Sequence, residues 1–147
     1  MAVKVTQNYT AEAIERTTDS GFTREYGVTL SLDEKAQVYM VSLFQGPEKN
    51  FFGSGSLSIV PTHRTLLYQV HTHTGVGVWG EGSPFTTFRN WMRGRSSIQS
   101  GPSSTGKTND LTAAGLWRER NNPNARFGVY YQAVALDGGL RWVYKSY

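Results

Sequence analysis

The chain has 147 residues, no cysteine and a formal net charge of +4. This length fits one domain with a single hydrophobic core, and the 38% hydrophobic and 13% aromatic content exclude a disordered chain. The lack of cysteine excludes disulfides, thiolate metal sites and the zinc-deaminase signature, so any metal must be bound by His, Asp, Glu or water. The sequence has no long apolar run, and its polar N-terminus lacks a signal-peptide core, so we expect no membrane contact.

The modest positive charge is compatible with an acidic partner or with an ordinary solvated surface. In the second half of the chain, basic residues are interleaved with Phe88, Trp91 and Trp117. These basic residues are Arg89, Arg93, Arg95, Lys107, Arg118, Arg120 and Arg126. Their clustering keeps a nucleic-acid partner open as an alternative.

The first predicted element is a short helix at residues 10–18. Thr10 is a suitable N-cap, because its hydroxyl can accept a hydrogen bond from the first turn. The helical spacing places Ala11, Ile14 and Thr18 on the inward face.

Stretches rich in β-branched and aromatic residues predict strands. Residues 26–32 and 37–44 form a hairpin, because a short polar turn joins them. Residues 66–73 form a third strand, which begins as an apolar run and ends in two histidines. The Gly/Ser-rich residues 51–60 can carry one more irregular strand.

Gly, Ser, Pro and Arg dominate residues 75–108, where we expect a long insertion with a short helix at residues 85–92. Residues 110–120 predict a helix, and residues 127–136 and 140–147 predict a closing hairpin. The order of elements predicts a single α+β domain, in which helices flank a mixed or antiparallel sheet.

His71 and His73 are the first candidate metal ligands. Side chains alternate along a strand, so these two imidazoles point to the same face and can bind zinc together. The alternative is a pair of surface or hydrogen-bonded histidines without a metal. Asp110 begins the late helix, where it can be either a third metal ligand or the N-cap of the helix. Glu25 precedes the first strand, where it can be either a proton acceptor or a solvated carboxylate.

The order of these segments resembles the JAMM (MPN-type) metallopeptidases. A helix precedes Glu25-Tyr26-Gly27, a strand ends in His71-Thr72-His73-Thr74, and a Ser-rich loop leads to Asp110 on a helix. The family pattern is an E-x-G-type motif, an HTH motif and a P-S-x-x-D-type motif that opens a helix. The chain is most similar to the JAMM-like C-terminal domains of bacterial Rhs-type polymorphic toxins, over residues from about 10 to 147. The resemblance implies a JAMM (cytidine-deaminase-like) architecture with a long insertion after the HTH motif.

Carried over to this chain, the resemblance implies a catalytic Zn²⁺ site with three protein ligands and a water. The ligands would be His71, His73 and Asp110. Glu25 would accept the proton of the water and pass it to the leaving amine. The loop serine that helps to stabilise the oxyanion would be one of Ser103, Ser104 and Thr105.

The resemblance further implies a secreted bacterial effector or toxin domain that is delivered into a target cell's cytoplasm. It would hydrolyse amide or isopeptide bonds of a protein substrate, and a cognate immunity protein would neutralise it. The length and Met1 suit a domain excised from a longer polypeptide, and equally a small native protein.

Two positions depart from the family pattern: Thr74 stands in place of a proline, and Lys107 lies three residues before Asp110, where the serine motif belongs. Two alternatives therefore stay open. One is a toxin that acts on nucleic acid through the histidines and the Arg-rich insertion. The other is a non-catalytic JAMM-like binding module.

Residues 101–108 also match the Walker A string G-x-x-x-x-G-K-[ST]. In that chemistry backbone amides surround phosphates, Lys107 contacts the terminal phosphates and Thr108 binds magnesium. A buried strand should precede such a loop, whereas a polar segment does so here, and the earlier chain predicts hairpins instead of parallel strands with crossovers. We therefore interpret these residues as a flexible loop before a helix.

Overall fold

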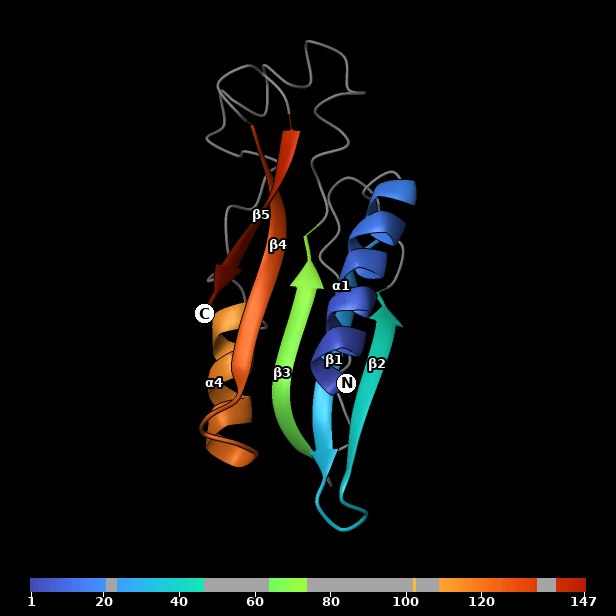
Figure 1. The fold of residues 1–147 in the computed structure, drawn as a ribbon. Coiled ribbons are helices and arrows are strands. Elements are labelled where there is room, and N and C mark those ends of the chain that lie inside the picture. The colour runs from blue at the N-terminus through green and yellow to red at the C-terminus, as the bar shows by residue number, and fades with distance from the viewer. Residues whose placement is uncertain (21–23, 47–63, 74–101, 103–108, 135–139) are drawn as a thin grey trace.

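The structure of the chain is a computed structural model, and it describes residues 1–20, 24–46, 64–73, 102, 109–134 and 140–147. Within these ranges a five-stranded sheet is packed against two helices (Figure 1). The elements are α1 (Ala2–Asp19), β1 (Tyr26–Asp33), β2 (Val38–Gln45), β3 (Thr65–Thr72), α4 (Asp110–Arg120), β4 (Arg126–Val134) and β5 (Leu140–Ser146). The strand order is β2-β1-β3-β4-β5, in which β3 and β4 are parallel and the other neighbours are antiparallel.

The prediction of an α+β domain with a mixed sheet is confirmed. The five strands predicted at residues 26–32, 37–44, 66–73, 127–136 and 140–147 agree with the observed ones to within two residues at each end. The late helix has its predicted bounds. The predicted strand at residues 51–60 and the helix at residues 85–92 lie outside the described residues, as does the insertion at residues 75–108 apart from Pro102.

The prediction for the first helix is wrong in its start and in its inward face. Helix α1 begins at Ala2, and Thr10 lies inside it, where its hydroxyl donates to the carbonyl of Thr6 (2.7 Å) instead of capping the helix. The buried residues are Thr6, Ala13 and Thr17, whereas Ala11 and Thr18 are exposed and Ile14 is half-buried. Threonine hydroxyls that bond to the carbonyl four residues back have a satisfied polar group, so threonines can line the buried face of this helix.

The two helices cover opposite faces of the sheet (Figure 1). On one face Ala13 of α1 packs against Val28 and Val70. On the other face Ala114 of α4 packs against Leu66 and Phe127. The sheet therefore has a hydrophobic core on each side.

A β-bulge in β3 decides which residues reach the α4 face. The pairing of β1 with β3 shifts between Leu30 and Ser31, so Ser31 is opposite Leu66 and Gly27 is opposite His71. Leu67 is the additional residue. Because of this additional residue, the side chains of Leu66 and His71 point to the same face. Without it, two residues five positions apart in a strand would point to opposite faces.

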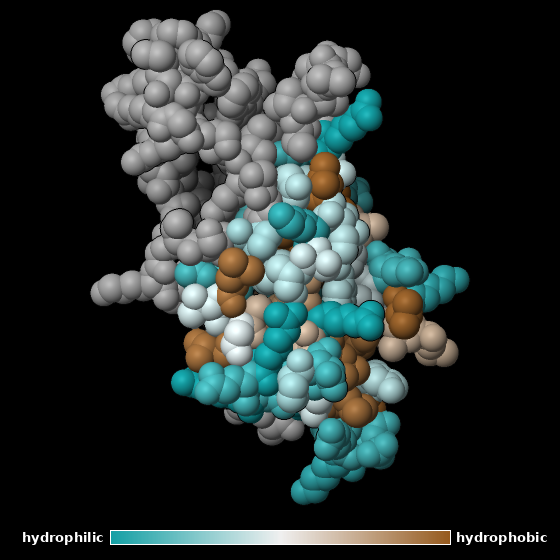
Figure 2. All heavy atoms as spheres, turned by 90° about the vertical axis from the view of Figure 1, so that its left-hand side faces the viewer, coloured by the Kyte–Doolittle hydropathy of each residue, from teal (hydrophilic) through white to brown (hydrophobic). Residues whose placement is uncertain are grey.

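Helix α1 leaves part of the sheet beyond β3 uncovered. A groove of about 980 Å³ lies there, between α1 and the end of the sheet formed by β4 and β5. Its lining includes Thr6, Thr10, Ile14, Tyr68, Tyr130 and Tyr144. On the side of α4 and β5 the described surface is mainly hydrophilic, with separate apolar patches (Figure 2).

Thr72 holds the end of β3 in place. Its buried hydroxyl lies 2.6 Å from the Thr17 hydroxyl, 3.0 Å from the Tyr26 amide nitrogen and 3.1 Å from the Tyr26 carbonyl oxygen. One side chain therefore joins α1, β1 and β3 between the two histidines.

We expect Thr72→Val to lower the free energy of unfolding by about 1–3 kcal/mol, because the Tyr26 amide loses a buried partner. Urea unfolding measures this change. Thr65→Val is the control: the Thr65 hydroxyl bonds to an exposed Glu34 carboxylate, so its loss should stay within about 0.5 kcal/mol. Equal effects of the two substitutions would contradict the role of Thr72.

Burial, followed by the hydrogen bond to Tyr144, raises the pKa of Tyr68 above its ordinary value of 10. The folded state thus keeps a proton that the unfolded state loses, so stability should fall as the pH rises above about 10. Urea unfolding between pH 8 and pH 11 tests this, and Tyr68→Phe should flatten the decline. A stability that is independent of pH over this range would contradict the expectation.

Candidate metal centre

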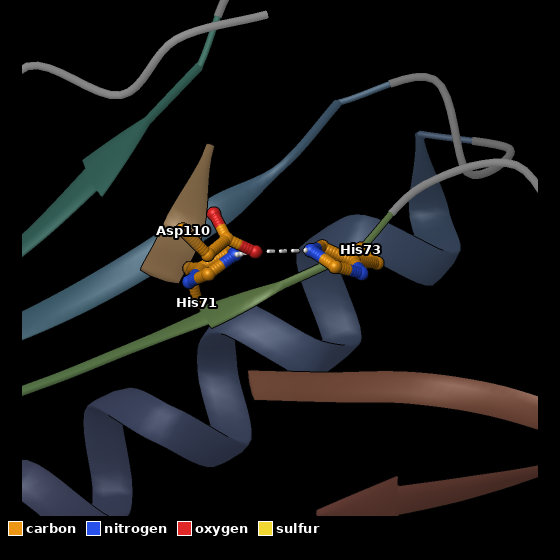
Figure 3. A group of neighbouring side chains, drawn as sticks. All are labelled: His71, His73 and Asp110. Atoms are coloured by element: carbon orange, nitrogen blue, oxygen red, sulfur yellow. Dashed lines mark hydrogen bonds and ion pairs between the residues drawn. The ribbon is translucent and has the colours of Figure 1, made fainter. Parts of the chain in front are cut away.

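Three predicted ligands meet on the α4 face of the sheet (Figure 3). One Asp110 carboxylate oxygen lies 3.0 Å from Nε2 of His73 and 3.3 Å from Nε2 of His71. The imidazole ring centroids are 5.0 Å apart. Both histidines are buried, with 5% and 4% of their surface exposed, whereas the Asp110 side chain is 21% exposed. The group has an open side at the carboxylate.

The donor atoms of this group fit a small divalent metal. A tetrahedral ion with bonds of about 2.0–2.1 Å separates its ligand atoms by about 3.3 Å. The two contacts of the Asp110 oxygen are close to this separation, and all three donor atoms lie within 4.8 Å of one another. Two imidazoles and one carboxylate leave a fourth position for a water or a substrate, as in catalytic zinc sites.

Local structure at the start of α4 directs Asp110 toward the histidines. The interpretation of Asp110 as the N-cap is wrong, because Asn109 caps the helix: its side-chain oxygen accepts a hydrogen bond from the amide of Thr112 (2.8 Å). Asp110 is the first helical residue, so its carboxylate can face the imidazoles. The positive end of the helix dipole favours a negative charge there.

The other end of α4 is tied to the beginning of β3. The Asn121 side chain accepts from the Leu66 amide (2.7 Å) and donates to the Arg64 carbonyl (2.8 Å). The Asn122 side chain donates to the Leu66 carbonyl (2.9 Å). These hydrogen bonds fix the helix alongside β3, so that its N-terminus lies near the histidines at the end of the strand.

Glu25 lies two residues before Gly27, which pairs with His71, so alternation along the chain directs the Glu25 side chain toward the face of the histidines. Glu25 is buried, with 8% of its surface exposed, and its charge contributes to raising the pKa of Tyr147, which touches His71. A buried carboxylate at this position can accept a proton from a reactant at the metal ligands.

Gly27 has a packing role beside the site. It is paired with Phe44 of β2 on one side and with His71 of β3 on the other. A Cβ atom on Gly27 would lie 2.4 Å from the Phe44 ring, so only glycine allows the ring to approach this closely. The glycine of the Glu25-Tyr26-Gly27 stretch therefore makes room for a side chain of the neighbouring strand.

Tyr147 is a residue of the site that the sequence did not indicate. Its hydroxyl lies 3.5 Å from Nδ1 of His71, and the two rings meet edge to face. Burial raises the pKa of Tyr147, and the charges of Asp110 and Glu25 add to the increase. No motif could have found this residue, because it follows the last strand and reaches His71 only through the folding of the sheet.

Other predicted site residues are not placed. Ser103, Ser104 and Thr105 lie outside the described residues, as does the Walker A-like segment apart from Pro102. In the described part of the basic segment, Arg118 donates to the carbonyls of Ala125 (3.0 Å) and Tyr147 (2.6 Å) and lies over the Phe127 ring. This arginine has a structural role.

Comparisons with protein-family models, with curated proteins and with solved structures give no match. In the described part of the chain, no helix is both long and apolar enough to cross a membrane. The function is therefore inferred from the site itself.

We expect a divalent metal ion to raise the melting temperature of the protein, because ligand binding to the folded state stabilises it. Thermal unfolding with Zn²⁺, Co²⁺ or Ni²⁺ measures this shift, which should shrink at lower pH as protons compete for the imidazoles. Asp110→Asn should reduce metal affinity by about tenfold or more. The control Asp19→Asn changes an exposed carboxylate at the end of α1 and should have no effect. Equal affinities of the two variants would exclude Asp110 as a ligand.

Proposed function

We propose that the chain is a zinc-dependent hydrolase of amide or isopeptide bonds, built as a JAMM-like domain and acting as a bacterial effector or toxin domain. The observation that carries this proposal is the convergence of His71, His73 and Asp110. The buried Glu25 directly precedes β1, the strand that pairs with β3. Segments far apart in the sequence supply these residues in the order of the JAMM pattern. The long insertion after the HTH motif belongs to this proposal.

The choice of zinc rests on the donor set. Two imidazole nitrogens and one carboxylate oxygen are typical of catalytic zinc, whereas calcium and magnesium prefer oxygen ligands alone. A four-coordinate ion would also leave room for a reactant on the more exposed side of Asp110. Zinc, when bound, would polarise the substrate carbonyl and acidify a water molecule.

The other steps of the reaction are assigned to residues of the chain. His71, His73 and Asp110 would hold the ion. Glu25 takes the proton of the attacking water as the new carbon–oxygen bond forms, and delivers it to the amine nitrogen as the carbon–nitrogen bond breaks. Burial of Glu25 and the imidazoles strengthens these electrostatic interactions by excluding solvent. One of Ser103, Ser104 and Thr105 would assist at the oxyanion.

The choice of a protein substrate rests on the resemblance. Of the described arginines in the basic segment, Arg118 is engaged in structural contacts, whereas Arg120 and Arg126 are exposed. The described sheet has one parallel strand pair, whereas a P-loop domain needs several. The immunity protein and the delivery into a target cell's cytoplasm rest on the resemblance alone.

We expect Glu25→Gln to keep zinc binding and to lower activity by about 10²–10⁴-fold, because the amide cannot accept the proton. Expression in a bacterial host measures toxicity, and mass spectrometry detects new termini or released lysines on host proteins. Glu34→Gln, an exposed glutamate in the β1–β2 turn, is the matched control and should retain activity.

Unchanged toxicity of the Glu25→Gln variant would reject the role of Glu25. Degradation of host RNA or DNA by the wild-type protein would reject the amide hydrolase in favour of a nuclease. A zinc-bound protein without toxicity and without cleavage products would favour the non-catalytic binding module.

A further inference from the structure

Three contacts hold Tyr147 next to the candidate metal centre. Its amide donates to the Phe127 carbonyl (3.0 Å), and its own carbonyl accepts from Arg118 of α4 (2.6 Å). Its ring packs beside the Phe127 ring, with centroids 5.9 Å apart. These contacts fix the ring without using the phenolic oxygen, which is directed to Nδ1 of His71 at 3.5 Å.

The two nitrogens of His71 have different surroundings. Nε2 lies 3.3 Å from the Asp110 carboxylate, on the side of the other ligands, whereas Nδ1 lies next to the Tyr147 hydroxyl. A neutral imidazole carries one proton, so a histidine that binds a metal through Nε2 must carry that proton on Nδ1. Metal-bound histidines almost always donate this proton to an outer partner, which fixes the ring and its tautomer.

We propose that Tyr147 is a positioning residue of the metal centre: its phenolic oxygen accepts the Nδ1 proton of His71 and thereby keeps Nε2 free for the ion. The proposal rests on the proposed metal site, and it assigns Tyr147 no contact with substrate. Arg118 links this outer partner to α4, the same helix that carries Asp110. The helix therefore supplies one ligand directly and steadies a second one through Tyr147.

A substitution can remove the phenolic oxygen of Tyr147 without removing the structural contacts of this residue. Tyr147→Phe removes the oxygen alone and keeps the backbone hydrogen bonds and the ring contact with Phe127. Tyr144→Phe is the matched control, because it removes another phenolic hydrogen bond, with Tyr68, which packs against the core on the α1 side of the sheet.

The experiment measures the zinc affinity of the wild-type protein and both variants by competition with a chelating dye. We expect Tyr147→Phe to weaken zinc binding by about 10- to 100-fold, the range for loss of an outer-shell partner. The Tyr144→Phe variant should bind zinc as the wild type does. The melting temperature without metal should change no more for Tyr147→Phe than for Tyr144→Phe.

Nitrogen-15 NMR of the imidazole rings, recorded with zinc bound, provides a second measurement that packing alone would not change. The proposal expects a His71 Nδ1 proton that exchanges slowly with solvent in the wild type and faster in Tyr147→Phe. Equal zinc affinities of wild type and Tyr147→Phe, or zinc bound to Nδ1 of His71, would overturn the role of Tyr147 and leave the proposed function standing. A wild-type protein that binds no zinc would instead overturn the proposed function, and this inference with it.

Discussion

The hydrogen bonds of the Thr72 hydroxyl fix the end of β3, from which both histidines of the site project. They join the end of β3 to α1 and to β1, where the regular ladder finishes. Because side chains alternate along a strand, fixing Thr72 toward α1 fixes His71 and His73 toward the opposite face. The polar contact on one side of the sheet therefore positions two imidazoles on the other side, and it does so without touching them.

The position of Asp110 follows from the chain topology. β3 and β4 are parallel neighbours, so the chain must return along the sheet between them, and α4 lies on this return path. A helix in such a crossover begins at the edge where the preceding strand ends. The first residue of α4 therefore lies near the last residues of β3, and a carboxylate at that position faces the two histidines.

Patterns of residue type were sufficient for the strands, for the bounds of α4 and for the histidine pair, because these depend on local alternation and propensity. The start of α1 was not predictable in the same way, since its buried face uses small and threonine residues whose hydroxyls are satisfied within the helix. Both Asn109 and Asp110 are suitable caps, and only the structure distinguishes them. Tyr147 reaches His71 through long-range packing that leaves no mark in local sequence.

The additional residue in β3 gives this strand two functions on a single surface. Before Leu67 the strand contributes Leu66 to the hydrophobic packing under α4, and after it the strand contributes His71 and His73 to the metal centre. The floor of the centre is thus continuous with a hydrophobic core. An ion bound there would have a weakly polarisable base on one side and the partly exposed Asp110 carboxylate on the other, which is an asymmetric electric environment for any reaction at its free position.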